Sequence, residues 1–116
     1  MLTNKDYCDL ETTKELELLG MNVYTSFGGV DVLKHVLLYE AQKWLREEKN
    51  MDVNAFYDNK DATWRFYILE IDSPDLSGTY AYKDAFISYE EALLEGIKEA
   101  IKIVKDGIRK QEIQNE

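Results

Sequence analysis

The sequence predicts an α+β domain in which helices pack on a small antiparallel sheet of two to four strands, in the order α(β)αββ(β)α. Apolar residues recur at helical spacing in three segments, and between the second and third of these the spacing changes to the alternation of a strand. The composition agrees, because 45% hydrophobic residues in a chain of 116 can form one core without disulfides or metal. We therefore interpret residues 1–116 as a single domain and expect 109–116 to be a frayed C-terminal tail.

The first helix is predicted over residues 10–19. Asp9 is a good N-cap, because its carboxylate can accept from a free backbone N–H of the first turn, and Glu11 is favoured there by the helix dipole. Gly20 suits the left-handed position that follows a helix. The next segment, 23–27, is expected to be extended.

A second helix is predicted to start at Asp31 as its cap and to run to about Glu48, after Gly28 and Gly29 break the chain as a hinge. The spacing of its apolar residues fits one side of a helix with 3.6 residues per turn. These core-facing residues are Leu33, Leu37, Ala41, Trp44 and Leu45.

A β-hairpin is predicted next. Residues 51–57 alternate between apolar and polar side chains, 58–61 form the turn, and 62–72 are rich in aromatic and β-branched residues. This last segment is apolar on both faces, which favours a central strand. After a loop at 73–78, residues 79–86 are expected to add a third short strand.

The last helix begins with a capping box, in which Ser88 is followed three residues later by Glu91. A continuous apolar stripe follows and indicates that this helix closes the core. The stripe consists of Leu93, Ile97, Ala100, Ile101, Val104 and Ile108.

Charge and cysteine content restrict the possible functions. The formal charge of −9 argues against direct nucleic-acid binding, which depends on Lys and Arg at the phosphates. Cys8 is the single cysteine, so an internal disulfide or a multi-cysteine metal site is not possible. No apolar run reaches the roughly 18 residues of a membrane span, and the first residues lack the pattern of a signal peptide. We expect a cytoplasmic protein without membrane contact.

Two residues could in principle do chemistry, and both have a simpler interpretation. His35 could be a general base, but a lone helical histidine is most often a surface or packing residue. Cys8 precedes a helix start, yet it lies before the cap, and a nucleophile also needs an orienting base. The adjacent acids at 47–48 and 90–91 point about 100° apart on a helix, so neither pair converges on one substrate atom. We predict no catalytic residues.

Metal and cofactor motifs also fail on their spacing. The segment from Asp72 to Gly78 resembles part of a calcium loop, but the twelfth position, which needs a bidentate Glu, is Lys83. Gly28 and Gly29 are not followed by the Gly-Lys-Ser/Thr of a phosphate loop. We therefore predict neither a metal nor a cofactor.

Aromatic residues are the most suggestive feature. The predicted sheet carries many rings in an acidic setting, which disfavours base stacking, because single-strand binders surround such rings with basic residues. Most of these rings should be core, and the surplus indicates a protein-binding patch, where Tyr and Trp are enriched. The predicted contact residues are Trp44, Trp64, Tyr67, Tyr80 and Tyr82.

Three segments together carry a resemblance to a known group. They read LETTKELELLGMNV at 10–23, LYEAQKWLREEKNMDV at 38–53 and ISYEEALLEGIKEAIKIV at 87–104. In this order they resemble small uncharacterised proteins from phages and prophages of Bacteroidetes-type gut bacteria. The resemblance covers roughly half of the chain. It implies a phage or mobile-element origin and production inside a bacterial host cell, and it implies no activity.

Three functions follow as hypotheses. The first is a non-enzymatic accessory protein that binds another protein through an exposed face of the sheet or of the second helix. The second is a nucleic-acid-related regulator or an acidic mimic of DNA, for which carboxylates should be regularly spaced along one face. The third is a small enzyme, for which a deep polar pocket with His35 or Cys8 and a carboxylate partner is the minimum requirement. A homodimer is compatible with each.

Overall fold

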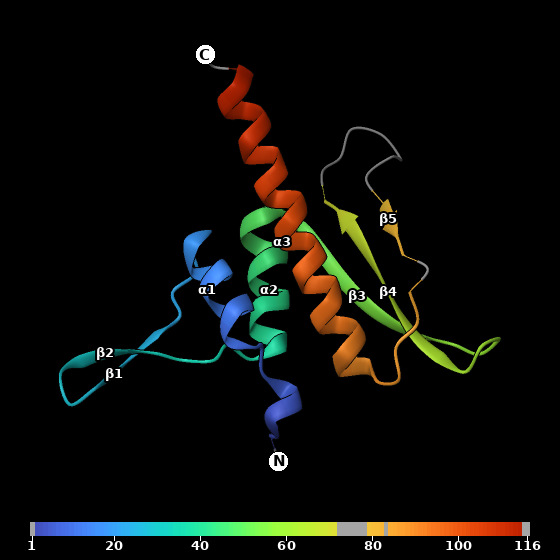
Figure 1. Cartoon of the computed structure of the whole chain (residues 1–116), viewed down its shortest axis with the longest axis horizontal. Coiled ribbons are helices and arrows are strands. Elements are labelled where there is room, and N and C mark those ends of the chain that lie inside the picture. The colour runs from blue at the N-terminus through green and yellow to red at the C-terminus, as the bar shows by residue number, and fades with distance from the viewer. Residues whose placement is uncertain (1, 72–78, 83, 115–116) are drawn as a thin grey trace.

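The structure, a computed structural model, describes residues 2–71, 79–82 and 84–114. Its α+β architecture confirms the predicted fold class, and the molecule is flat, with extents of 50 × 47 × 20 Å. Figure 1 shows the helices grouped in the middle, a sheet on one side and a separate β-hairpin on the other. In chain order the elements are η1 (Asn4–Asp6), α1 (Leu10–Leu18), β1 (Tyr24–Phe27), β2 (Val30–Leu33), α2 (Leu38–Lys49), β3 (Met51–Asp58), β4 (Thr63–Glu70), β5 (Thr79–Ala81) and α3 (Tyr89–Gln114).

The larger sheet has three antiparallel strands in the order β3-β4-β5. The predicted hairpin is confirmed, because β3 pairs with β4 along its whole length, from Met51 opposite Glu70 to Asp58 opposite Thr63. The predicted third strand is confirmed by β5, and β4 is therefore the central strand. Phe86 extends this pairing with a bridge to Trp64. The expected loop at 73–78 lies outside the described residues.

The core lies between one face of this sheet and the helices α2 and α3. Val53, Phe66 and Ile68 point from the sheet into this core, where α3 contributes Leu93, Ile97, Ala100 and Ile101. A Cβ atom added at Gly96 would lie 2.7 Å from Val53 Cγ1, which is closer than real Cβ contacts. The lack of a side chain at Gly96 therefore lets α3 approach the sheet closely.

The ends of α1 and the start of α3 follow the predicted capping chemistry. The Asp9 carboxylate accepts a hydrogen bond from the Thr12 N–H at 2.7 Å, and Gly20 has a φ of +111° after the helix. The Ser88 hydroxyl accepts from the Glu91 N–H at 3.1 Å. The Glu91 carboxylate accepts in turn from the Ile87 N–H, one residue before the cap.

The predicted start of the second helix is wrong. Asp31 lies in β2, opposite Ser26, and α2 begins only at Leu38, seven residues later. Gly28 and Gly29 both have positive φ, +58° and +83°, so they form a tight two-residue hairpin turn and not a hinge. Val30 and Val32 follow the turn in β2, where β-branched residues are favoured.

The observed start of α2 is fixed by contacts that the sequence pattern did not reveal. The Glu40 carboxylate accepts from the Leu37 N–H at 3.1 Å, and it also pairs with Lys34. Leu37 forms a bridge with Tyr7, so the segment before the helix is held in extended form. Leu33 and Leu37 match the helical spacing, but both lie outside α2.

The helix α3 is longer than predicted. Its backbone is helical as far as Gln114, which includes most of the segment 109–116 that we expected to fray. In the predicted stripe, the residues up to Ile101 are buried, while Ile108 is exposed. No helix in the described part of the chain is both long enough and apolar enough to cross a bilayer.

Candidate functional site

The hairpin formed by β1, its glycine turn and β2 is the most unusual surface of the molecule. We call residues 24–33 the arm. Figure 1 shows the arm extending away from the helices, on the opposite side from the larger sheet. Its two strands pair only with each other, in a two-stranded sheet. A two-stranded hairpin alone has marginal stability in water, so an uncovered arm is a candidate contact surface.

One face of the arm is apolar and exposed. The strand register sets Thr25 opposite Val32 and Phe27 opposite Val30. Because directly opposite residues share a face and side chains alternate along a strand, these four lie together. Phe27 is 80%, Val30 63% and Val32 45% exposed, and Thr25 is exposed as well. We call this group the arm face.

The other face of the arm is polar and has its own partners. The Ser26 hydroxyl donates to Asp31 at 3.1 Å, and the Tyr24 hydroxyl donates to Glu17 of α1 at 3.1 Å. Leu33 packs partly against the core at the base of the arm. The arm is thus anchored through one face, and the arm face points the other way.

The outer face of the larger sheet is a second, smaller apolar surface. Phe56 and Tyr67 contact each other there with ring centroids 5.9 Å apart, and Leu69 lies on the same face. All three are exposed, because α2 and α3 cover the opposite face of this sheet. This surface is an exposed sheet face of the kind that the protein-binding hypothesis requires, and no described helix packs on it.

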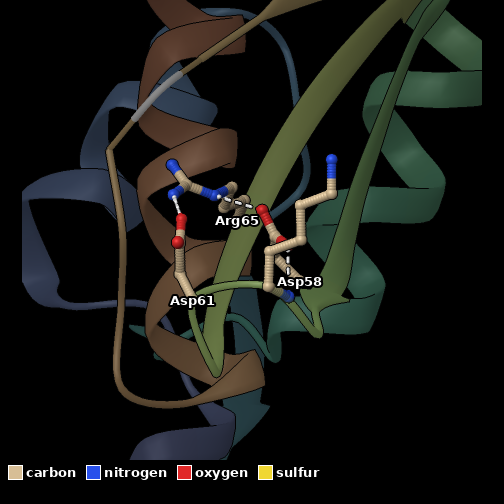
Figure 2. Close-up of polar contacts among 4 residues, drawn as sticks. Asp58, Asp61 and Arg65 are labelled. Carbon is tan, nitrogen blue, oxygen red and sulfur yellow. Dashed lines mark hydrogen bonds and ion pairs between the residues drawn. The ribbon is translucent and has the colours of Figure 1, made fainter.

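Charged residues border this second surface at the β3–β4 turn. Arg65 contacts both Asp58, with Nε to Oδ2 at 3.0 Å, and Asp61, as Figure 2 shows. The Asp58 carboxylate also accepts from the Lys60 N–H at 3.0 Å. This backbone hydrogen bond and Arg65 together hold the pKa of Asp58 below its ordinary value. The turn end of the sheet is therefore an ordered, charged rim.

The predicted contact residues do not gather on one surface. Tyr67 is exposed on the outer face of the sheet. Trp64 is half-buried between Tyr57 and Tyr89, in edge-to-face contacts. The other three predicted residues are partly buried against the core. Trp44 lies under Lys49, Tyr80 lies beside Glu70, and Tyr82 stacks on Phe66.

His35 and Cys8 line one groove of about 840 Å³, between the N-terminal segment and the start of α3. His35 Nδ1 lies 3.0 Å from the Cys8 carbonyl oxygen, a position in which the ring nitrogen can donate. Burial, with the nearby Asp9 and Glu40 carboxylates, raises the pKa of the Cys8 thiol to about 12, so it stays protonated and unreactive near neutral pH.

The groove also contains carboxylates. Asp9, Glu90 and Glu91 line it, and among the described residues none of them forms an ion pair with His35. His35 also lies before α2 and not within the second helix as expected. The adjacent acids at 47–48 lie on α2, at exposed positions.

The structure describes only part of the residues that were considered for metal binding and for mimicry of DNA. Within residues 2–71, 79–82 and 84–114, no three His, Cys, Asp or Glu side chains come together as a metal site would require. The calcium-like segment from Asp72 lies outside the described residues. Carboxylates alternate with lysines in ion pairs such as Asp9–Lys98 and Glu99–Lys102, which is unlike the regular row of acids in a DNA mimic.

The sequence contained a signal for the arm that the helical interpretation hid. Two glycines between apolar and β-branched residues, in FGGV, are a typical signal of a two-residue hairpin turn. Interpreting FGGV as a hairpin turn would have identified Phe27, Val30 and Val32 as residues of one strand pair.

Comparison with known proteins adds no relative. The chain matches no family model, no curated protein and no solved structure.

Proposed function

We propose that the chain is a protein-interaction module without catalytic activity of its own, and that the arm is its main contact surface. The observation that carries this proposal is the arm face, an exposed and uncharged group of apolar side chains on a hairpin that extends from the body (Figure 1). Contiguous exposed apolar side chains of this kind mark interaction sites. An accessory role in a phage or other mobile element rests on the sequence resemblance alone.

Burial of the arm face would supply the binding free energy. Complete burial of a Val or Phe side chain contributes roughly 1.5–3 kcal/mol, and Phe27 and Val30 are still mostly exposed. The same contact would stabilise the hairpin, which has no other element packed on this face within the described residues. Binding and ordering of the arm would therefore support each other.

The edges of the arm give a second reason. The Lys34 N–H donates to the Val23 carbonyl at 2.8 Å, so alternation directs the backbone groups of Tyr24, Ser26, Asp31 and Leu33 outward. Exposed edges of monomeric proteins usually carry lysines or prolines that block further pairing. Residues 24–33 contain neither, and their one charge, Asp31, is hydrogen-bonded to Ser26.

The test is an affinity capture from a lysate of cells that naturally make the protein, with tagged wild-type chain and two arm variants. Phe27→Ser removes the aromatic ring of the arm face. Val32→Thr keeps the β-branched shape but replaces one methyl group with a hydroxyl. Ile87→Ser is the matched control, because Ile87 is 92% exposed and lies outside the arm. Circular dichroism confirms that each variant is folded.

We expect the wild type and Ile87→Ser to retain the same protein, and both arm variants to retain at least tenfold less of it, which corresponds to about 1.4 kcal/mol. Equal retention by all four chains would assign binding to another surface, such as Tyr67 and Phe56. Recovery of the tagged bait alone, with neither an untagged copy of the chain nor another protein, would argue against the proposal.

A further inference from the structure

We infer that the arm face is covered by a second copy of this chain, with two arms stacked face to face about a two-fold axis. This inference rests on the proposed function, because it names the protein that the arm binds. The occupant is argued from the charge distribution and from the chemistry of the arm face, and the size of this face sets the expected strength of the contact.

The charge distribution allows two copies to meet at the arm. Each chain carries a net charge of −9, with 14 basic and 23 acidic residues, so most of its surface repels a second copy. In the arm only Asp31 is charged, and it lies on the face opposite to Phe27 and Val30. The outer face of the larger sheet is less suitable, because it is bordered by a charged cluster in which two acids, Asp58 and Asp61, share one base, Arg65. An extended arm also keeps the two acidic bodies apart (Figure 1).

The arm face is complementary to itself. Its four side chains, those of Thr25, Phe27, Val30 and Val32, include no charge, so a two-fold axis brings no like charges together. Two sheets that stack face to face lie about 10 Å apart with their apolar side chains interdigitated. The hydrogen bonds of Ser26 and Tyr24 are on the other face and remain in place.

The size of the arm face sets the expected strength. Four side chains from each copy cover much less than the roughly 800 Å² per partner of a standard stable interface. The dimer should therefore depend on concentration and exchange with monomer, and its contact should be driven by apolar burial. Added salt should strengthen it, because salt screens the repulsion between two acidic bodies and leaves apolar contact intact.

The experiment is analytical ultracentrifugation of the full chain over a range of concentrations, at low and high salt. We expect the mass to rise from 13.6 kDa toward twice that value with concentration, at lower concentrations when salt is high. Phe27→Ser and Val32→Thr should each weaken the dimer at least tenfold. Ile87→Ser should leave its dissociation constant within about twofold, since ordinary surface changes have small effects.

Two results would overturn the inference: a mass of 13.6 kDa at every concentration, or a dimer that both arm variants leave unchanged. Comparison with the affinity capture separates the two proposals. A monomer that still captures another protein in an arm-dependent way contradicts the second copy and keeps the arm as a binding surface. Loss of arm dependence in both experiments contradicts both.

Discussion

The two antiparallel sheets of this protein have similar local pairing but different surroundings. The β3–β5 sheet is covered on one face by α2 and α3, and Val53 and Ile68 are completely buried there. The arm has the same kind of strand pairing, yet the four residues of its strand β1, Tyr24–Phe27, are all exposed. The comparison shows that strand pairing alone does not give a stable sheet, because most of the stabilisation comes from the layer packed on it.

The edges of the two sheets differ in the same way. The side chain of Gln42 on α2 donates to the Val53 carbonyl at 2.7 Å, so a helix protects the β3 edge of the larger sheet. At the edge of the arm, the Asn22 side chain accepts from the Tyr24 N–H at 3.3 Å, but no helix lies along the arm as α2 lies along β3 within the described residues. A sheet with a covered face and a protected edge is built for stability, whereas an uncovered hairpin is available for contact.

The largest expected difference is in hydrogen exchange. Amides in β3 and β4 should exchange only on global unfolding, which typically requires about 5–15 kcal/mol. Amides of the arm should exchange through local opening, at least a thousandfold faster. The measurement is exchange followed by NMR at low protein concentration, so that self-association does not protect the arm. Equal protection in both sheets would show that the arm is part of the cooperative core.

Two phenylalanines test the same difference by mutation. Phe66 is 2% exposed in the larger sheet, and Phe66→Ala should lower the free energy of unfolding by about 3–5 kcal/mol. Phe27→Ala should change it by no more than about 0.5 kcal/mol. Urea denaturation measures both. A large loss of stability in Phe27→Ala would mean that the arm contributes to the monomer core.

Two glycines of α3 test how closely the helix covers the sheet. Gly96→Ala should destabilise by about 1–3 kcal/mol, because the new methyl group meets Val53 and Phe66. Gly107→Ala is the matched control in the same helix, since no atom lies within 4 Å of an added Cβ. It should stabilise by up to about 1 kcal/mol through helix propensity. A neutral Gly96→Ala would show that the helix–sheet contact is looser than described.

The smallest expected effect concerns Asp9, at the start of the helix that precedes the arm. Burial raises its pKa, but hydrogen bonds from Thr12 and Lys98 outweigh this, so the pKa lies below its ordinary value of 3.8. Its contribution is therefore complete above pH 3.8 and is lost as the pH falls through the lower, folded value. Asp9→Asn keeps a capping oxygen without this titration.

The pH dependence of urea unfolding measures the contribution of Asp9. The decline in stability at acidic pH should be shallower in Asp9→Asn than in the wild type, by about 1 kcal/mol or less. Identical pH profiles would assign the acid sensitivity to other carboxylates, such as Asp58, whose pKa is also lowered.

Much of the fold could be predicted because its signals are local. Asp9, Gly20 and Ser88 act on backbone groups within a few residues, so their caps are readable from sequence. The alternation in 51–57 and the apolar run in 62–72 gave the hairpin and its central strand correctly. The second helix failed because Leu33 and Leu37 fit a helical spacing by coincidence, while the glycine turn decided the local geometry.

The candidate site was harder to predict because exposure depends on the whole structure. Tyr80 and Tyr82 are aromatic residues like Tyr67, yet they pack on the core, and nothing in their residue type distinguishes them. Phe27 ended a segment that was expected to be extended, and Val30 lay between the predicted hinge and the predicted helix cap, so the two were not considered together as surface residues.

The sequence by itself determined the elements whose forces act within a few residues: the capped helices, the alternating strands and the glycine turn. Only the tertiary structure decided which apolar side chains are buried under another element. Burial depends on which layers meet, and in this chain α2 and α3 cover the β3–β5 sheet and leave Phe27, Val30 and Val32 of the arm in water.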